Sequence, residues 1–252
     1  LIALMLFLKN RNLKNLLIIS SLLILIDVLI YLSGERTSFA LLTMITIFII
    51  IFISKLKILR LMTFLMSIVI VVLLTLISND VKERNIDQTF AQMGVGNNDR
   101  IMIFSGRHES HYQSALKMFK SNPLLGVGPK MFRELCSKSE YYINEDTCST
   151  HPHNTYIQLL AEVGMIGTII FLILPGYVIF KLFQYVYLYF RSGYRVLNDY
   201  QICLIGCFII TLWPLAPTLS LFNNWISVVY YLPIGFFLSS INQKNLKEQS
   251  AC

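Results

Sequence analysis

The sequence predicts an all-α integral membrane protein, a polytopic bundle of about six complete transmembrane helices plus a partial one, with one long external loop. Of its 252 residues, 55% are hydrophobic and only 14% are charged, which is unlike a soluble domain. Apolar runs close to the roughly 17 to 25 residues that cross a bilayer as a helix recur along the chain. Lysines and arginines gather in alternate connections between these runs, as in cytoplasmic loops.

The predicted membrane helices fall in two blocks, residues 1–78 and 157–241. The chain opens in the apolar run Leu1–Leu8, which we interpret as the end of a further helix, so we expect N-terminal helices to be missing. Residues 242–252 are expected to form a cytoplasmic tail. The predicted complete spans are about Leu16–Leu32, Thr37–Ser54, Leu61–Ser78, Ile157–Phe180, Tyr200–Pro217 and Trp225–Ser240.

Basic residues set the predicted orientation of these spans. The net charge of +7 therefore reflects the position of the chain in the membrane, and we expect no nucleic-acid partner. The connections without a basic excess are external, and the longest of them covers residues 79–156. The basic residues assigned to the cytoplasmic side are Lys9, Arg11, Lys14, Lys55, Lys57, Arg60, Lys181, Arg191, Arg195, Lys244 and Lys247.

The external loop is expected to contain short helices. In the stretch HESHYQSALKMFKSNP, apolar and aromatic residues are spaced for one helical face, and Pro123 should end the helix. The following LLGVGPKMF predicts a turn, because glycine and proline interrupt regular structure. Its Gly-x-Gly lacks the third glycine and the acidic residue of a nucleotide site. The residues on the predicted helical face are Tyr112, Ala115, Leu116 and Phe119.

Two pairs of small residues are expected to bring segments of the chain close together. Cys136 and Cys148 lie in the same external loop, where an oxidising compartment permits a disulfide; two unpaired thiols are the alternative. Gly164 and Gly167 are expected to let another helix approach closely.

A polar stripe marks the helix that follows the loop, in THPHNTYIQLLAEVGMIG. Pro152 favours a helix start near residues 152–154, Pro152 to Asn154. From there Asn154, Gln158 and Glu162 recur every four residues on one face, which must contact protein or water rather than lipid. A carboxyl group at this depth is a candidate functional group. The alternative is a buried carboxyl that pairs with a basic neighbour.

His151 and His153 flank the start of this helix, where unpaired backbone N–H groups and the helix dipole favour phosphate. Three interpretations are open. A zinc site is weakly supported, because His-x-His offers only two ligands. The histidines could also be capping or interfacial residues without chemistry. We favour proton transfer at a phosphate-binding helix end, because histidine titrates near neutral pH.

Two arginines are candidate phosphate ligands on the same predicted side. Arg36, in SGERTSFALL, begins a span, and Arg107, in FSGRHES, opens the loop helix. Their planar guanidinium groups suit phosphate oxygens. The alternatives are an interfacial anchor for Arg36 and a solvated loop charge for Arg107. Asp27 lies within a predicted span, and the sequence offers no partner for it.

Four motifs in this order resemble the O-antigen ligase family of bacterial polytopic membrane glycosyltransferases, which also includes polysaccharide polymerases. They are SGERTSFALL, SGR ahead of a helix, NPLLGVGPKMF and HPHNTYIQLLAEVGMIG, and the resemblance spans about residues 30–185. It implies a GT-C type helical architecture in the inner membrane with a periplasmic active site. It also implies glycan transfer from undecaprenyl diphosphate to an acceptor sugar hydroxyl, by inversion and without a metal ion or other cofactor.

The resemblance also implies residue roles. Arg36 and Arg107 match the family's essential arginines and would bind the diphosphate, with Asn154 beside them. His153 matches the essential histidine and would take the proton of the attacking hydroxyl, while His151 would orient His153. The acceptor would be a lipid A core for a ligase or a second undecaprenyl-linked glycan for a polymerase, and we favour the ligase. A transporter of lipid-linked glycans, with polar residues near the bilayer midplane, is the rival from another class.

Overall fold

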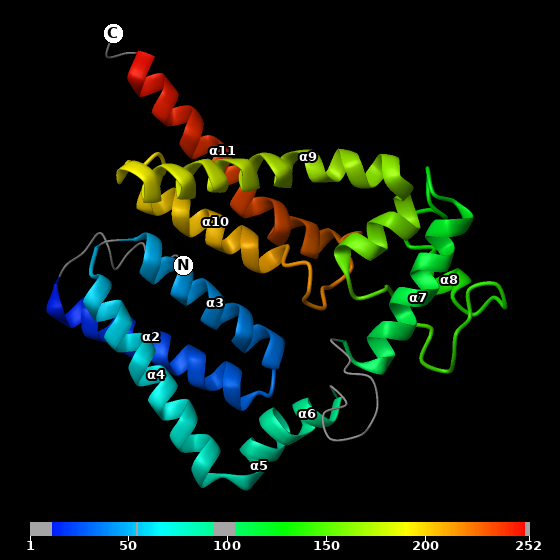
Figure 1. The fold of residues 1–252 in the computed structure, drawn as a ribbon, viewed down its shortest axis with the longest axis horizontal. Helices are drawn as coiled ribbons and strands as arrows, with labels where there is room; N and C mark the ends of the chain where they lie inside the picture. Colours follow the sequence, from blue (N-terminus) through cyan, green and yellow to red (C-terminus); the bar gives the residue numbers. More distant parts are fainter. Residues whose placement is uncertain (1–11, 54, 93–103, 250–252) are drawn as a thin grey trace. The chain divides into compact units, whose positions relative to one another are not determined.

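The computed structural model describes residues 12–53, 55–92 and 104–249, and this part of the chain is helical, without strands. The helices divide between two compact units (Figure 1). One contains α2 to α6 and α10 as far as Ile210, and the other contains α7 to α9 and α11. The elements are α2 (Leu13–Leu32), α3 (Arg36–Phe52), α4 (Lys57–Ile77), α5 (Asn79–Lys82), the π-helical segment η1 (Glu83–Asp87), α6 (Gln88–Gln92), α7 (Gly106–Ser121), α8 (Phe132–Leu135), α9 (Thr155–Ser192), α10 (Asp199–Thr211) and α11 (Asn224–Gln249).

Among the described residues, four helices are long and apolar enough to cross a membrane: α2, α4, α9 and residues Asn224–Asn242 of α11. The apolar helices α3 and α10 have only 17 and 13 residues. At about 1.5 Å per residue they are shorter than the roughly 30 Å hydrocarbon core. The all-helical membrane class is therefore confirmed, whereas the expected six complete spans reduce to four candidates. The partial span at Leu1–Leu8 lies outside the described residues.

In the first unit, polar groups join the packed helices α2, α3 and α4 (Figure 1). Arg60 is buried, and its guanidinium group donates to the backbone carbonyls of Ile49 and Ile53. Both carbonyls lie at the C-terminal end of α3: that of Ile49 also accepts from the backbone N–H of Ile53, whereas that of the C-cap Ile53 lies beyond the last turn of the helix. Asp27 accepts a hydrogen bond of 2.7 Å from the hydroxyl of Ser67, so its partner is a side chain of α4.

The helix predicted in the external loop is confirmed as α7, which ends two residues before Pro123. Its buried face differs in part from the expected one. Tyr112, Ala115 and Met118 are buried, whereas Leu116 is 39% exposed. Spacing of three residues selects this face, because α7 packs against α9 along it.

Helix α9 is interrupted near its start, where Gly164 has φ 66° and ψ −171° (Figure 1). A β carbon on Gly164 would lie 2.3 Å from the carbonyl oxygen of Leu124, so a larger residue does not fit. The expectation that Gly164 admits another helix is therefore wrong, because it admits residues 123–128. Four backbone hydrogen bonds join the two segments: Val127 N–H to Ala161, Gly128 N–H to Glu162, Met165 N–H to Pro123 and Ile166 N–H to Leu124.

The loop beside α8 is joined to the rest of the second unit by a covalent bond and a small core. Cys136 and Cys148 form a disulfide. Cys136 also packs with Phe132, Tyr141 and Ala161 in a cluster of buried residues. Further along the chain, α11 continues to Gln249, so most of the segment expected to be a tail is helical.

Candidate functional site

All four histidines of the chain gather in the second unit. The ring centroid of His153 lies 4.1 Å from that of His151 and 5.4 Å from those of His108 and His111. His108 and His111 come from α7, and the sequence signal for them is their spacing of three residues, which puts both on one helical face. Within the described residues, no group of three or more His, Cys, Asp or Glu side chains is arranged to hold a metal ion.

His153 has the features of a proton acceptor. Its φ of 59° is rare for a residue with a side chain, and Thr218 N–H donates to its backbone carbonyl at 2.9 Å. Among the described residues, its ring nitrogens form no hydrogen bond. Burial and then the neighbouring histidines lower the pKa of His153 to about 4. The ring is therefore neutral at neutral pH and offers a lone pair.

His151 is held in place at both ring nitrogens. Its Nε2 donates to the backbone carbonyl of Thr218 at 3.0 Å, because a carbonyl can only accept. Its Nδ1 lies 2.9 Å from the hydroxyl of Thr150, which then donates to it. The side chain is buried, and burial is the main cause of its lowered pKa. This arrangement suits a positioning role.

Asn154 is the N-cap of α9. Its carboxamide oxygen accepts hydrogen bonds from the backbone N–H groups of Tyr156 and Ile157, and its Nδ2 donates to the carbonyl of Pro214 at 2.8 Å. The helix start predicted near Pro152 to Asn154 is confirmed, at the C-terminal end of that range. The expectation that these first backbone N–H groups are unpaired is wrong for two of them, because the cap takes both. Diphosphate binding by Asn154 stays a prediction.

Gln158 and Glu162, in the polar stripe of α9, form hydrogen bonds with two loops. The Glu162 carboxylate is fully buried and accepts from the backbone N–H groups of Lys130 and Phe132, both at 3.0 Å. Gln158 Nε2 donates to the same carboxylate at 3.1 Å, and Gln158 Oε1 accepts from Leu221 N–H at 3.1 Å. The stripe faces protein, as predicted. The partners of Glu162 are backbone and amide N–H groups rather than a basic side chain.

The two candidate arginines lie in different units. Arg107 is on the first turn of α7, and its Nε lies 3.3 Å from a carboxylate oxygen of Asp146, with side chains that are 73% and 54% exposed. After burial, the charge of Arg107 is the second cause of the lowered pKa of His108, so Arg107 lies beside the histidines. Arg36 belongs to the first unit, where its guanidinium group donates to the side chains of Gln92 at 3.0 Å and Gln88 at 3.3 Å.

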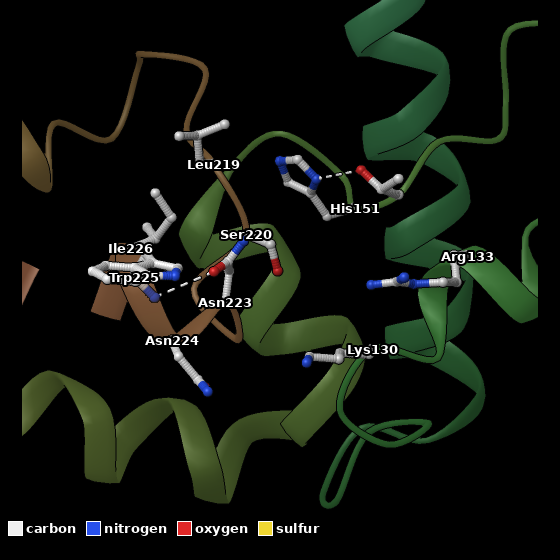
Figure 2. A pocket seen from close by; sticks show the side chains of 10 residues that line it. Lys130, Arg133, His151, Leu219, Ser220, Asn223, Asn224, Trp225 and Ile226 are labelled. Carbon is white, nitrogen blue, oxygen red and sulfur yellow. Dashed lines mark hydrogen bonds between the residues drawn. The ribbon is translucent and has the colours of Figure 1, made fainter. Parts of the chain in front are cut away.

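A cavity of about 540 Å³ lies beside His151 in the second unit (Figure 2). Lys130 and Arg133 point into the same open space as His151, and the segment around Trp225 faces them. The sequence signal for this site is limited to the basic residues that follow GVGP. The lining residues are Lys130, Arg133, Thr150, His151, Leu219, Ser220, Asn223, Asn224, Trp225 and Ile226.

A family model described as O-antigen ligase matches residues 19–172, more than half of the chain. The chain belongs to the O-antigen ligase family. The matched region of this O-antigen ligase family member contains Arg36, Arg107 and all four histidines. Membership makes the protein a glycosyltransferase-like membrane enzyme that acts on lipid-linked glycans. No curated protein and no solved structure matches the chain.

Proposed function

We propose that this protein transfers a glycan from undecaprenyl diphosphate to a sugar hydroxyl of a lipid A core, at the periplasmic face of the bacterial inner membrane. The observation that supports this most directly is His153, a neutral and unbonded ring within the described residues, in the same unit as Arg107. An enzyme that moves a glycan to a hydroxyl needs a group that accepts the hydroxyl proton.

In the proposed reaction, the acceptor oxygen attacks the anomeric carbon and its proton passes to His153. The bond between that carbon and the diphosphate oxygen breaks, and the diphosphate leaves with the electron pair, so the configuration inverts. Arg36 and Arg107 stabilise the negative charge that develops on the leaving group. Charge stabilisation by two guanidinium groups does not require a metal ion.

The low pKa of His153 fits a late proton transfer. A ring with a pKa of about 4 stays unprotonated in the resting enzyme but is a weak base. The attacking hydroxyl becomes acidic only as its new bond to the anomeric carbon forms. We therefore place removal of the proton by His153 late in the proposed reaction, as the bond to the diphosphate breaks. His151, fixed by Thr150 and Thr218, holds the neighbouring ring in place.

A ligase and a polymerase catalyse the same glycan transfer and differ in the acceptor. A ligase uses a lipid A core, and a polymerase uses a second undecaprenyl-linked glycan. Both share the donor and the leaving group, so Arg36, Arg107 and His153 have the same roles in each. We favour the ligase because the resemblance is strongest to that reaction. Transport of lipid-linked glycans is the alternative from another class.

The direct test is release of the carrier. Purified protein is mixed with an undecaprenyl diphosphate glycan and a lipid A core, and free undecaprenyl diphosphate is measured. We expect release that depends on the acceptor and stops in His153→Asn. Binding of the donor without release contradicts the proposal and favours a transporter. Release with a second carrier-linked glycan as the acceptor, and none with the core, indicates a polymerase.

A further inference from the structure

Two cations converge on the cavity beside His151 (Figure 2). Lys130 precedes α8 and Arg133 lies within it, and both side chains point toward the open space. Neither forms an ion pair with the described part of the chain. None of the residues that line the cavity is acidic. The side chains that line the cavity therefore carry only positive charge, which favours an anion.

Neutral groups on the opposite wall are those that recognise sugars. Asn223 and Asn224 bring carboxamide groups, and Ser220 brings a hydroxyl. The Asn223 side-chain oxygen accepts from the backbone N–H of Trp225 at 3.2 Å, which fixes the turn that presents the indole ring. Trp225 is 82% exposed and lines the cavity, so its ring is accessible to the apolar C–H face of a sugar.

A buried pair holds the two walls of the cavity together. Glu162 binds the backbone N–H groups of Lys130 and Phe132, and Gln158 binds Glu162 and the backbone N–H of Leu221. Lys130 has φ 63°, a conformation that a residue with a side chain adopts at a cost. Such strain persists where surrounding contacts enforce it, and it concentrates at ligand sites. The cations are thus placed by contacts from the fully buried Glu162.

We propose that this cavity binds a negatively charged saccharide, a sugar unit with a phosphate or carboxylate group, as part of the glycan that the enzyme transfers or extends. The inference rests on the proposed function. Lys130 and Arg133 bind the anionic group, the carboxamides of Asn223 and Asn224 bind hydroxyls, and Trp225 covers the ring. The volume of about 540 Å³ is in the range of small-molecule sites, roughly 300 to 1,000 Å³.

Binding to Trp225 can be measured without turnover. The full chain with Trp213→Phe keeps Trp225 as its one tryptophan, since the sequence has 2. Its fluorescence is followed in titrations with glucose 6-phosphate, glucuronate, glucose and inorganic phosphate at constant ionic strength. We expect saturable changes with the two charged sugars and much weaker ones with glucose or phosphate alone. Equal binding of glucose removes the role of charge, and equal binding of inorganic phosphate removes the role of the sugar.

Charge variants identify the residues responsible. Lys130→Gln with Arg133→Gln is expected to weaken binding of the charged sugars by about 10-fold or more. The matched control, Lys120→Gln with Lys138→Gln, removes two exposed cations outside the cavity and should bind as the parent does. Thermal unfolding of each variant shows whether it is folded. Unchanged binding in a folded double variant overturns the proposal, whereas absent carrier release with intact binding overturns only the proposed reaction.

Discussion

The ring of His153 lies 4.1 Å, centroid to centroid, from the ring of His151, yet the two rings differ in their hydrogen bonds. Thr150 and Thr218 engage both nitrogens of His151. Within the described residues, no group engages those of His153. Of these two adjacent histidines, only His153 has a ring nitrogen available to accept a proton from a substrate.

The first prediction separates these two rings by mutation. His153→Ala should lower the rate of glycan transfer by about 10² to 10⁴, the range for removal of a general base. His151→Ala should weaken transfer less, because its effect passes through the position of its neighbour. Rates are measured by carrier release, and thermal unfolding confirms that both variants are folded. Equal losses in the two variants contradict the assignment of His153 as the base.

The second prediction concerns pH. Because the pKa of His153 is lowered to about 4, kcat/KM should stay level as the pH falls from neutral and decline only near pH 4. His111→Asn removes one neighbouring ring that lowers this pKa, so the decline should move to higher pH. The control is Lys120→Asn in the last turn of the same helix, which should keep the pH profile of the parent. A decline near the ordinary histidine pKa of about 6.5 in the parent protein contradicts the environment described for His153.

The free energy of unfolding should also fall as the pH is lowered from neutral. The pKa of His153 in the folded state lies below the ordinary value of 6.5, so the unfolded chain takes up the proton first as the pH falls. The contribution of this ring to stability is therefore complete above that value and is lost as the pH falls toward about 4. The lowered pKa values of His108, His111 and His151 act with the same sign.

The third prediction tests the buried link between the cavity walls. Glu162→Gln replaces one acceptor oxygen by an NH₂ group that faces a backbone N–H, so a buried donor loses its partner. The free energy of unfolding should fall by about 1 to 3 kcal/mol. Glu134→Gln, an exposed carboxyl on α8, should change it by less than about 0.5 kcal/mol. The melting temperatures of the Glu162→Gln and Glu134→Gln variants are compared. Equal melting temperatures contradict a stabilising role for the hydrogen bonds of Glu162.

Local features of the sequence predicted much of this site. Pro152 and Asn154 indicated where α9 begins, because capping depends on residues next to each other in the chain. The spacing of Gln158 and Glu162 indicated a face that contacts protein. The partner of Glu162 could not be predicted, because Lys130 lies 32 positions away and reaches it only through the fold.

The interrupted helix and the histidine cluster show the same limit. Gly164 is compatible with close packing by a helix or by a loop, and only the fold shows that Leu124 approaches it. His108 and His111 share a helical face, but their approach to His153 depends on how α7 packs against α9. Chain composition predicted the membrane class. It did not predict the length of α10, which has 13 residues and ends at Thr211, before the predicted end of the span at Pro217.

The fourth prediction concerns Arg36. Arg36→Lys keeps the positive charge but loses the planar fork that binds two phosphate oxygens, so transfer should fall severely while membrane insertion stays normal. Arg191→Lys makes the same chemical change in the last turn of α9, on the predicted cytoplasmic side, and should leave transfer unchanged. Carrier release and the amount of membrane-inserted protein are measured together. Activity equal to that of the parent reduces Arg36 to an interfacial anchor.

The last prediction concerns the orientation on which the periplasmic assignment depends. Basic residues mark the loop around Ser192 as cytoplasmic and leave the loop that contains Ser139 external. Both side chains are exposed. Single Ser139→Cys and Ser192→Cys variants are made in a background that keeps the disulfide and replaces the other cysteines by alanine. In cells with a permeabilised outer membrane, an impermeant thiol reagent should label the cysteine at position 139 and leave that at position 192 unlabelled. The opposite pattern places His153 and Arg107 on the cytoplasmic side, where a periplasmic lipid-linked glycan cannot reach them.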